Sequence, residues 1–229
     1  MFPTCEFLFM EQIYKIFDIL DDWRHLPAYQ LERRSDIFFA SYLPQLIKAK
    51  FSYNIDFIIP EFPIRIGHVS DSQSRINQSF RIDYLLYDST AKKVFLLELK
   101  TDQNSRREKQ DWYLEQASKI GIVGIIDGLI EIYKASSQKN KYRYLLNKLE
   151  EMGWIKRVDK EFFNQNIDII PEIIYLQPTN QDNLPNIISF EDVISILRMN
   201  PDPFSDRFCV SLEKWKNKPG ISIIRMEKF

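Results

Sequence analysis

A stretch near the middle of the chain, R81-I-D-Y-L-L-Y-D-S-T-A-K-K-V-F-L-L-E-L-K100, predicts a β-hairpin. Its two apolar segments flank D88-S-T-A91, which is typical of antiparallel strands joined by a short loop. The second segment runs V-F-L-L and then places Glu98 and Lys100 on either side of Leu99. A charge inside an apolar strand costs free energy unless it is paired or binds an ion. Glu98 and Lys100 are therefore expected to have a partner of opposite charge or to bind an ion.

The expected strand pairing brings a third charge to the same face. Side chains alternate along a strand, so Glu98 and Lys100 point the same way. If 88–91 is a four-residue loop, Asp83 lies opposite Leu96 and one diagonal step from Glu98, on the face of both charges. Diagonal neighbours are roughly 7–8 Å apart, which lets two carboxylates hold one ion. A loop longer or shorter by one residue would reverse this parity.

Two carboxylates on one face repel each other unless a cation lies between them or one is protonated. Carboxylate oxygens, a backbone carbonyl and water are the ligands that Mg²⁺ or Mn²⁺ prefers, and the Leu99 carbonyl is placed to contribute. Such an ion acidifies a bound water and stabilises charge on a phosphate. Lys100 would orient that water or offset charge in the transition state. The alternative is a surface ion pair of Lys100 with Glu98 or Asp83 at the strand end.

Asp83, followed after fourteen residues by the E-L-K that ends at Lys100, resembles the metal-binding signature of the PD-(D/E)XK nuclease superfamily. The resemblance implies a Mg²⁺-dependent phosphodiesterase that acts on DNA more often than on RNA. It implies that Asp83 and Glu98 are metal ligands and that Lys100 is the catalytic lysine. Many members also carry a glutamate on the first core helix, for which Glu32 is the best match and Asp36 the reserve.

The chain departs from the superfamily pattern at two points. Ile82 precedes Asp83 where the signature has proline. Some exonuclease-like branches have a glutamine and a tyrosine four residues apart after the lysine, whereas Tyr113 follows Gln110 by three. Arg107, Gln110 and Tyr113 still recur at helical spacing. Gln110 and Arg107 are therefore predicted to contact nucleic acid, and Tyr113 is equally well explained as core packing.

Periodicity and turn residues predict the elements around the hairpin. Helices are expected over 6–22, 29–49, 105–134, 138–152 and 190–199, and strands over 57–66, 80–87, 93–100 and 169–178. Pro44 is expected to kink or split the second helix. A capping box of Ser105 and Glu108 begins the third helix, which is expected to break among its glycines. Pro60 and Pro63 make the first strand irregular or an edge strand.

This order predicts an α/β protein in which a mixed β-sheet is flanked by helices. It resembles the αβββαβ restriction-endonuclease-like core of the superfamily, with one inserted helix. We predict a single nuclease-like domain over 1–229, with its core at about 29–178. The helix at 6–22 and the segment 179–229 are elaborations of that core.

The net charge of −1 and the pI of about 6.2 argue against a protein that coats nucleic acid through bulk charge. They do not exclude a nuclease, because a metal site is itself acidic. Local charge differs, and the segment 134–160 has eight basic residues and three acids: Lys134, Lys139, Lys141, Arg143, Lys148, Lys156, Arg157 and Lys160 against Glu150, Glu151 and Asp159. Lys141 and Arg143 are predicted to contact phosphates, as is the polar loop 67–79, and the alternative is a solvated helix face.

Compartment and partners follow from simpler signals. No apolar run reaches the length of a membrane span, and the first residues show no basic leader or cleavage signature. Cys5 and Cys209 form no metal-binding pattern, so we expect a cytoplasmic protein. Nucleic acid, DNA rather than RNA, is the expected partner, and a homodimer is compatible with cutting two strands.

Three functions are compatible with these residues. The first is a metal-dependent nuclease in which Asp83, Glu98, Lys100 and Glu32 converge. The second is a nuclease-like module that binds nucleic acid or a protein partner without cutting it. The third is a structural subunit whose hairpin charges form ion pairs. Selective binding of Mn²⁺ would separate the first function from the third.

Overall fold

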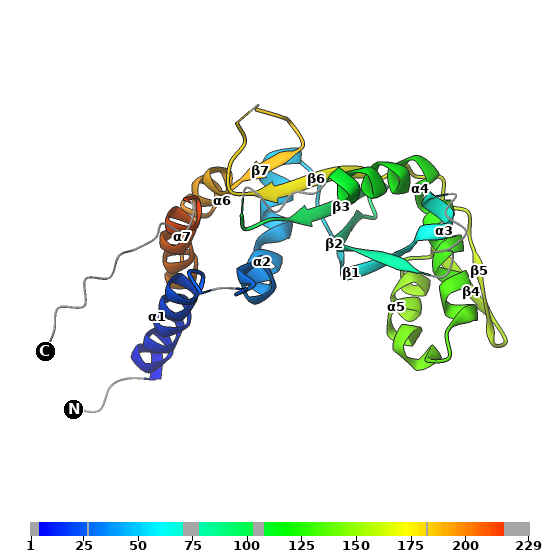
Figure 1. Cartoon of the computed structure of the whole chain (residues 1–229), viewed down its shortest axis with the longest axis horizontal. Helices are drawn as coiled ribbons and strands as arrows, with labels where there is room; N and C mark the ends of the chain where they lie inside the picture. The colour runs from blue at the N-terminus through cyan, green and yellow to red at the C-terminus, as the bar shows by residue number, and fades with distance from the viewer. Residues whose placement is uncertain (1–4, 27, 71–77, 103–107, 182, 218–229) are drawn as a thin grey trace, which may run out of the picture. The chain divides into compact units, whose positions relative to one another are not determined.

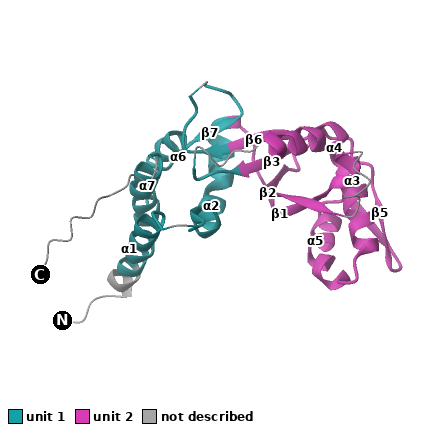
Figure 2. Ribbon diagram, viewed as in Figure 1, with its two compact units in different colours: residues 1–50, 99–105, 176–229 teal, residues 51–98, 106–175 magenta. Residues whose placement is uncertain are grey.

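The computed structural model describes residues 5–26, 28–70, 78–102, 108–181 and 183–217, without the side chains of 5–9. The chain divides into two compact units, each made of segments that are distant in sequence (Figure 2). Unit 1 comprises residues 1–50, 99–105 and 176–229, and unit 2 comprises residues 51–98 and 106–175. The single domain predicted over 1–229 stays a prediction.

Seven helices and seven strands make up the described residues (Figure 1). The helices are α1 Cys5–Trp23, α2 Leu31–Phe51, α3 Ile66–Val69, α4 Glu108–Ala135, α5 Lys139–Glu151, α6 Phe190–Leu197 and α7 Pro203–Trp215. The strands are β1 Phe57–Arg65, β2 Ser79–Asp88, β3 Lys93–Leu99, β4 Ile155–Val158, β5 Glu161–Asn164, β6 Glu172–Gln177 and β7 Ile187–Ser189. Every helix and strand expected from periodicity is present.

Five strands form one sheet in the order β1-β2-β3-β6-β7. β1 pairs with β2 and β2 with β3 in antiparallel fashion, whereas the arrows of β3 and β6 point the same way in Figure 1. The sheet is therefore mixed and has helices around it, which confirms the predicted α/β class. β1 lies at one edge of the sheet, which is one of the two outcomes predicted from Pro60 and Pro63. Proline has no backbone N–H to donate, so it is disfavoured in a strand that is paired on both sides.

The hairpin turn lies one residue later than predicted. Asp88 is still in β2, opposite Lys93, so the loop is 89–92 rather than 88–91. The Asp88 carboxylate accepts hydrogen bonds from the backbone N–H groups of Ala91 (2.8 Å) and Asn54 (2.7 Å), which fixes the end of the strand. Local side-chain bonds of this kind are not visible in an apolar/polar pattern. The loop keeps four residues, so the predicted face of each side chain is unchanged.

Elements outside the predicted set complete the two units. The hairpin of β4 and β5 in unit 2 was missed because its strands have only four residues each. Helix α7 begins with an Asp202 cap whose carboxylate accepts from the N–H groups of Phe204 and Ser205, followed by Pro203 in the first turn. Within the described residues, no helix is both long and apolar enough to cross a membrane.

In unit 1, an aromatic core joins α2, α6 and α7. The ring of Phe39 packs on Phe190 at 5.5 Å and on Phe208 at 5.1 Å between centroids, and all three side chains are fully buried. Pro44 lies inside α2, which continues unbroken from Leu31 to Phe51. The predicted splitting of this helix at Pro44 is therefore wrong, because packing of its buried face outweighs the one lost backbone hydrogen bond.

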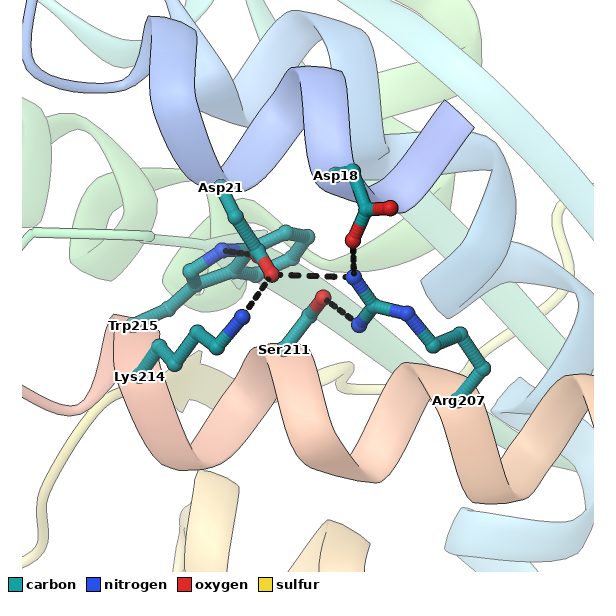
Figure 3. Close-up of polar contacts among 6 residues, drawn as sticks. All are labelled: Asp18, Asp21, Arg207, Ser211, Lys214 and Trp215. Carbon is teal, nitrogen blue, oxygen red and sulfur yellow. Dashed lines mark hydrogen bonds and ion pairs between the residues drawn. The ribbon is translucent and has the colours of Figure 1, made fainter. Parts of the chain in front are cut away.

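A polar network links α1 to α7 beside that core (Figure 3). Arg207, which is 4% exposed, donates to Asp18 at 2.7 Å and to Asp21 at 3.0 Å. Asp21 also accepts from Lys214 at 2.6 Å and from the Trp215 indole N–H at 2.9 Å. One carboxylate therefore satisfies three donors of the facing helix.

In unit 2, α4 breaks at Gly121, as its glycines predicted. Gly121 has φ = 66°, and the N–H of the next residue, Ile122, donates to the carbonyl of Ile169 at 2.9 Å. A Cβ on Gly121 would lie 3.3 Å from that carbonyl oxygen. The left-handed conformation and the close backbone together require glycine here.

Gly121→Ala should lower the free energy of unfolding by about 2 kcal/mol, because an L side chain is strained at this φ and meets the Ile169 carbonyl. Gly153 is the matched control, since its φ is 72° and nothing lies within 4 Å of the added Cβ. Gly153→Ala should cost about 1 kcal/mol through strain alone. Urea unfolding of both variants measures the difference, and equal losses would show that the Ile169 contact adds nothing.

Candidate functional site

Asp83 and Glu98 lie on adjacent strands of unit 2. The register ends with the pair Tyr84 and Leu97, and the next residues outward are Asp83 in β2 and Glu98 in β3. The predicted pairing of Asp83 with Leu96 is wrong, because Leu96 lies opposite Leu85. A register continued by one residue would place Asp83 opposite Glu98, where paired Cβ atoms are about 4.5–5.5 Å apart. Glu98 is 2% exposed and Asp83 is half-buried.

Gln110, in the first turns of α4, reaches Glu98. Its side-chain amide N–H donates a hydrogen bond to Oε1 of Glu98. One helical position further on, Asp111 accepts from the Tyr175 hydroxyl at 2.8 Å, which ties the same turn of α4 to β6. A carboxylate has about four lone-pair sites, so one hydrogen bond does not by itself exclude a bound cation. Gln110 was predicted to contact nucleic acid. It lies against Glu98, and its contact with nucleic acid stays a prediction.

Aromatic side chains surround the same turn of α4. Tyr113 stacks on Phe80 of β2 with centroids 5.0 Å apart, and Trp112 meets Tyr113 edge-on at 5.2 Å. Trp112 is 43% exposed, and the ammonium of Lys109 lies 5.9 Å from the Tyr113 ring. Tyr113 is thus part of a packed cluster, which was one of its two expected uses. Sequence reasoning missed Phe80 and Trp112, because only the tertiary structure brings β2 beside α4.

In unit 1, Lys100 is held between strand and helix. Its side chain is buried, with 5% of the residue exposed, and its backbone N–H donates to the Leu176 carbonyl at 2.8 Å. Its ammonium lies 3.8 Å from Oε2 of Glu32, in the first turn of α2. The reserve candidate, Asp36, accepts from the backbone N–H of Ile37 at 2.7 Å. Glu32, one of the two candidates on this helix, thus forms an ion pair with Lys100, and its predicted catalytic role stays a prediction.

Burial bears on one of the sequence interpretations. Glu98 of β3 and Lys100, which follows the last strand residue, are 2% and 5% exposed, so an ion pair that they form is not on the surface. Lys100 does lie 3.8 Å from Glu32, and ion pairing of the hairpin charges stays a second interpretation. Removing an ion from water costs roughly several kcal/mol in a real protein even after relaxation, and such buried charges are common at functional sites.

The donor set suits Mg²⁺ or Mn²⁺. Mg²⁺ is usually held by one or two carboxylates and keeps several waters. Asp83 and Glu98 supply two carboxylates, and the Leu99 carbonyl follows directly along the chain. Among the described residues, no group of three or more His, Cys, Asp or Glu side chains is gathered to hold a metal.

The predicted nucleic-acid contacts fall in different places. Arg107 and the capping residue Ser105 lie outside the described residues, as does most of the loop 67–79. Lys141 and Arg143 are exposed on α5 of unit 2. In the part of the chain that the structure describes, neither side chain makes a hydrogen bond or ion pair with Asp83, Glu98 or Gln110.

Comparison of the chain with protein-family models, curated proteins and solved structures found no match. The functional interpretation therefore depends on the chemistry of the chain's own residues.

Proposed function

We propose that this protein is a metal-dependent nuclease that hydrolyses phosphodiester bonds in nucleic acid, with DNA favoured over RNA. The observation that supports this proposal most strongly is the burial of two charges, Glu98 near the end of β3 and Lys100 just after that strand. The spacing of Asp83, Glu98 and Lys100 resembles the signature of the PD-(D/E)XK nuclease superfamily. Burial at 2% and 5% argues against an ion pair on the surface as the reason for that spacing.

Asp83 and Glu98 would hold the metal, with the Leu99 carbonyl and water completing its ligands. When bound, Mg²⁺ supplies a water of lowered pKa and an electrophilic partner for a phosphate oxygen. The Gln110 amide fixes the orientation of Glu98 through its hydrogen bond to Oε1. A ligand carboxylate that is itself hydrogen bonded keeps one geometry, which raises metal affinity.

Lys100 would position the attacking water or stabilise negative charge that grows on the phosphate. Glu32, at 3.8 Å, gives its ammonium a carboxylate partner and restrains the flexible four-carbon stem. Because Lys100 is buried, its charge acts in a medium of low dielectric, where it is worth more than in water. Metal binding is thus assigned to Asp83 and Glu98, and charge stabilisation to Lys100. A substitution at Lys100 should therefore lower the cleavage rate without lowering metal affinity.

The direct test is cleavage of supercoiled plasmid, linear duplex DNA, single-stranded DNA and RNA with Mg²⁺ or Mn²⁺. We expect cleavage that stops on chelation and falls at least about 100-fold in Asp83→Asn, because loss of one ligand charge weakens metal binding. Asp22→Asn, an exposed aspartate of α1, is the matched control and should retain activity.

The substrate forms separate the remaining possibilities. Nicking of the plasmid would identify an endonuclease, and degradation confined to linear ends would identify an exonuclease. If folded protein cleaves none of the four substrates with either metal, the nuclease proposal fails. Binding of nucleic acid that survives chelation and the loss of Lys100 would then identify a non-cutting binding module.

A further inference from the structure

An exposed tyrosine lies in the middle of a basic helix face in unit 2. Tyr144 of α5 is 73% exposed, the highest value among the large apolar and aromatic side chains of the described residues. Lys141 and Lys148 are three residues before and four residues after it, which places all three on one face. The Lys148 ammonium lies 5.3 Å from the Tyr144 ring. The opposite face of the helix is anchored by the buried Leu146 and Leu149.

We call this surface the α5 basic face, and its members are Lys141, Arg143, Tyr144 and Lys148. In the described part of the chain, none of its three basic side chains forms an ion pair with a carboxylate within 4.0 Å. Its lysines contact the rings of neighbouring tyrosines of the same helix, with Lys141 over Tyr142 at 5.8 Å and Lys148 over Tyr144 at 5.3 Å.

The order of charges along α5 only partly suits the helix dipole. Acidic residues are favoured in the first turn of a helix and basic residues in the last. Helix α5 has no acid in its first turn, its last turn has Lys148 together with Glu150 and Glu151, and its cap residue Gln138 makes no side-chain capping hydrogen bond. Residues that bind a ligand often depart from such rules of helix stability. The basic residues in the first turn of α5 are therefore consistent with a binding surface.

The neighbouring hairpin extends the same kind of surface. β4 packs beside α5 and is paired with β5. Lys156 and Arg157 of β4 are exposed, and Phe163 of β5 is 48% exposed. Cations interleaved with exposed aromatic rings are the chemistry with which proteins bind unpaired nucleic-acid strands.

We propose that the α5 basic face binds single-stranded nucleic acid, with the Tyr144 ring stacked on an unpaired base and the flanking cations on backbone phosphates. The choice of nucleic acid as the partner rests on the proposed nuclease function. The single strand follows from Tyr144, because base faces are covered in a duplex and are open to an aromatic ring only when unpaired.

Binding is measured by fluorescence anisotropy of a labelled single-stranded DNA oligonucleotide in the presence of a chelator, so that no cleavage occurs. Tyr144→Ala should weaken binding about 10-fold, as expected for loss of one stacked base. Tyr144→Phe keeps the ring and should bind like the wild type. Asn147→Ala, an exposed neighbour on the same helix, controls for local damage.

The cations are tested through salt dependence. A triple variant, Lys141→Gln, Arg143→Gln and Lys148→Gln, should lower the slope of log K against log salt concentration by about 2, because each phosphate contact on a single strand contributes about 0.7. The control changes three lysines elsewhere, Lys48, Lys92 and Lys119, to glutamine and should leave the slope unchanged.

Three results would overturn this proposal. In the first, Tyr144→Ala binds the oligonucleotide as tightly as the wild type does. In the second, the protein binds duplex DNA as tightly as the single strand, and in the third it binds polyphosphate, which has no bases, as tightly as DNA. Metal-dependent cleavage that is unaffected by Tyr144→Ala and by the triple variant would leave the nuclease standing and reject the α5 basic face. Tyr144-dependent binding from a protein that never cleaves would support the α5 basic face and reject the nuclease.

Discussion

Lys100→Met should reduce metal-dependent cleavage about 100- to 1,000-fold while leaving metal affinity nearly unchanged. Removal of one group that stabilises transition-state charge typically has an effect of this size. Methionine suits the test because it matches the length of the lysine stem. Removing one partner of a buried ion pair is destabilising, so folding of the variant is measured before its activity. Glu32, the partner left behind, is 32% exposed at its side chain and can be hydrated.

Three measurements make this prediction specific. Titration with Mn²⁺ should give similar affinities for Lys100→Met and the wild type, because the proposed metal ligands are Asp83 and Glu98. Lys48→Met, an exposed lysine of α2 in the same unit, should cleave normally. A folded Lys100→Met protein that retains full cleavage would remove the lysine from the proposed mechanism.

Asp21→Ala should lower the free energy of unfolding by about 3 kcal/mol, the largest loss we expect from a residue outside the candidate site. Its carboxylate accepts from Arg207, Lys214 and Trp215, and Arg207 is 4% exposed (Figure 3). Removing it leaves a buried guanidinium with a weaker set of partners. Asp22→Ala, the exposed neighbour, should change stability by less than about 0.5 kcal/mol. Chemical denaturation of both variants provides the comparison.

The pH dependence of this difference identifies the cause. Burial alone would raise the pKa of Asp21, but hydrogen bonds from Lys214, Ser211 and Arg207 outweigh it and hold that pKa below its usual value of 3.8. A carboxyl whose pKa is lowered by folding contributes stability above the unfolded pKa and loses it as pH falls through the folded one. The gap between wild type and Asp21→Ala should therefore be constant above pH 4 or so and shrink below it. A gap that persists in acid would point to lost packing instead.

Local pattern was sufficient for the hairpin and most helices. Two apolar segments around a short polar loop predicted β2 and β3, and the glycines of the third predicted helix indicated a break there, because these features depend on residues close in sequence. The same pattern misplaced the turn by one residue. Asp88 accepts hydrogen bonds from the backbone N–H groups of Ala91, three residues away, and Asn54, 34 residues away, and an apolar/polar pattern shows neither. The four-residue strands β4 and β5 were too short to produce a periodic signal.

For this protein, the sequence by itself determined that Glu98 and Lys100 flank Leu99 at the end of an apolar segment, on one face of an extended chain because side chains alternate. The prediction that Asp83 shares that face depended in addition on the length of the hairpin loop. Only the tertiary structure decided that Glu98 and Lys100 are buried, and that Gln110 and Glu32 are their polar partners. Burial and long-range contacts depend on how elements that are distant in sequence pack against each other. The hydrophobic periodicity within one helix or strand does not specify that packing. The same limit applies to Asp21 and Arg207, which lie 186 residues apart and meet only in the folded chain.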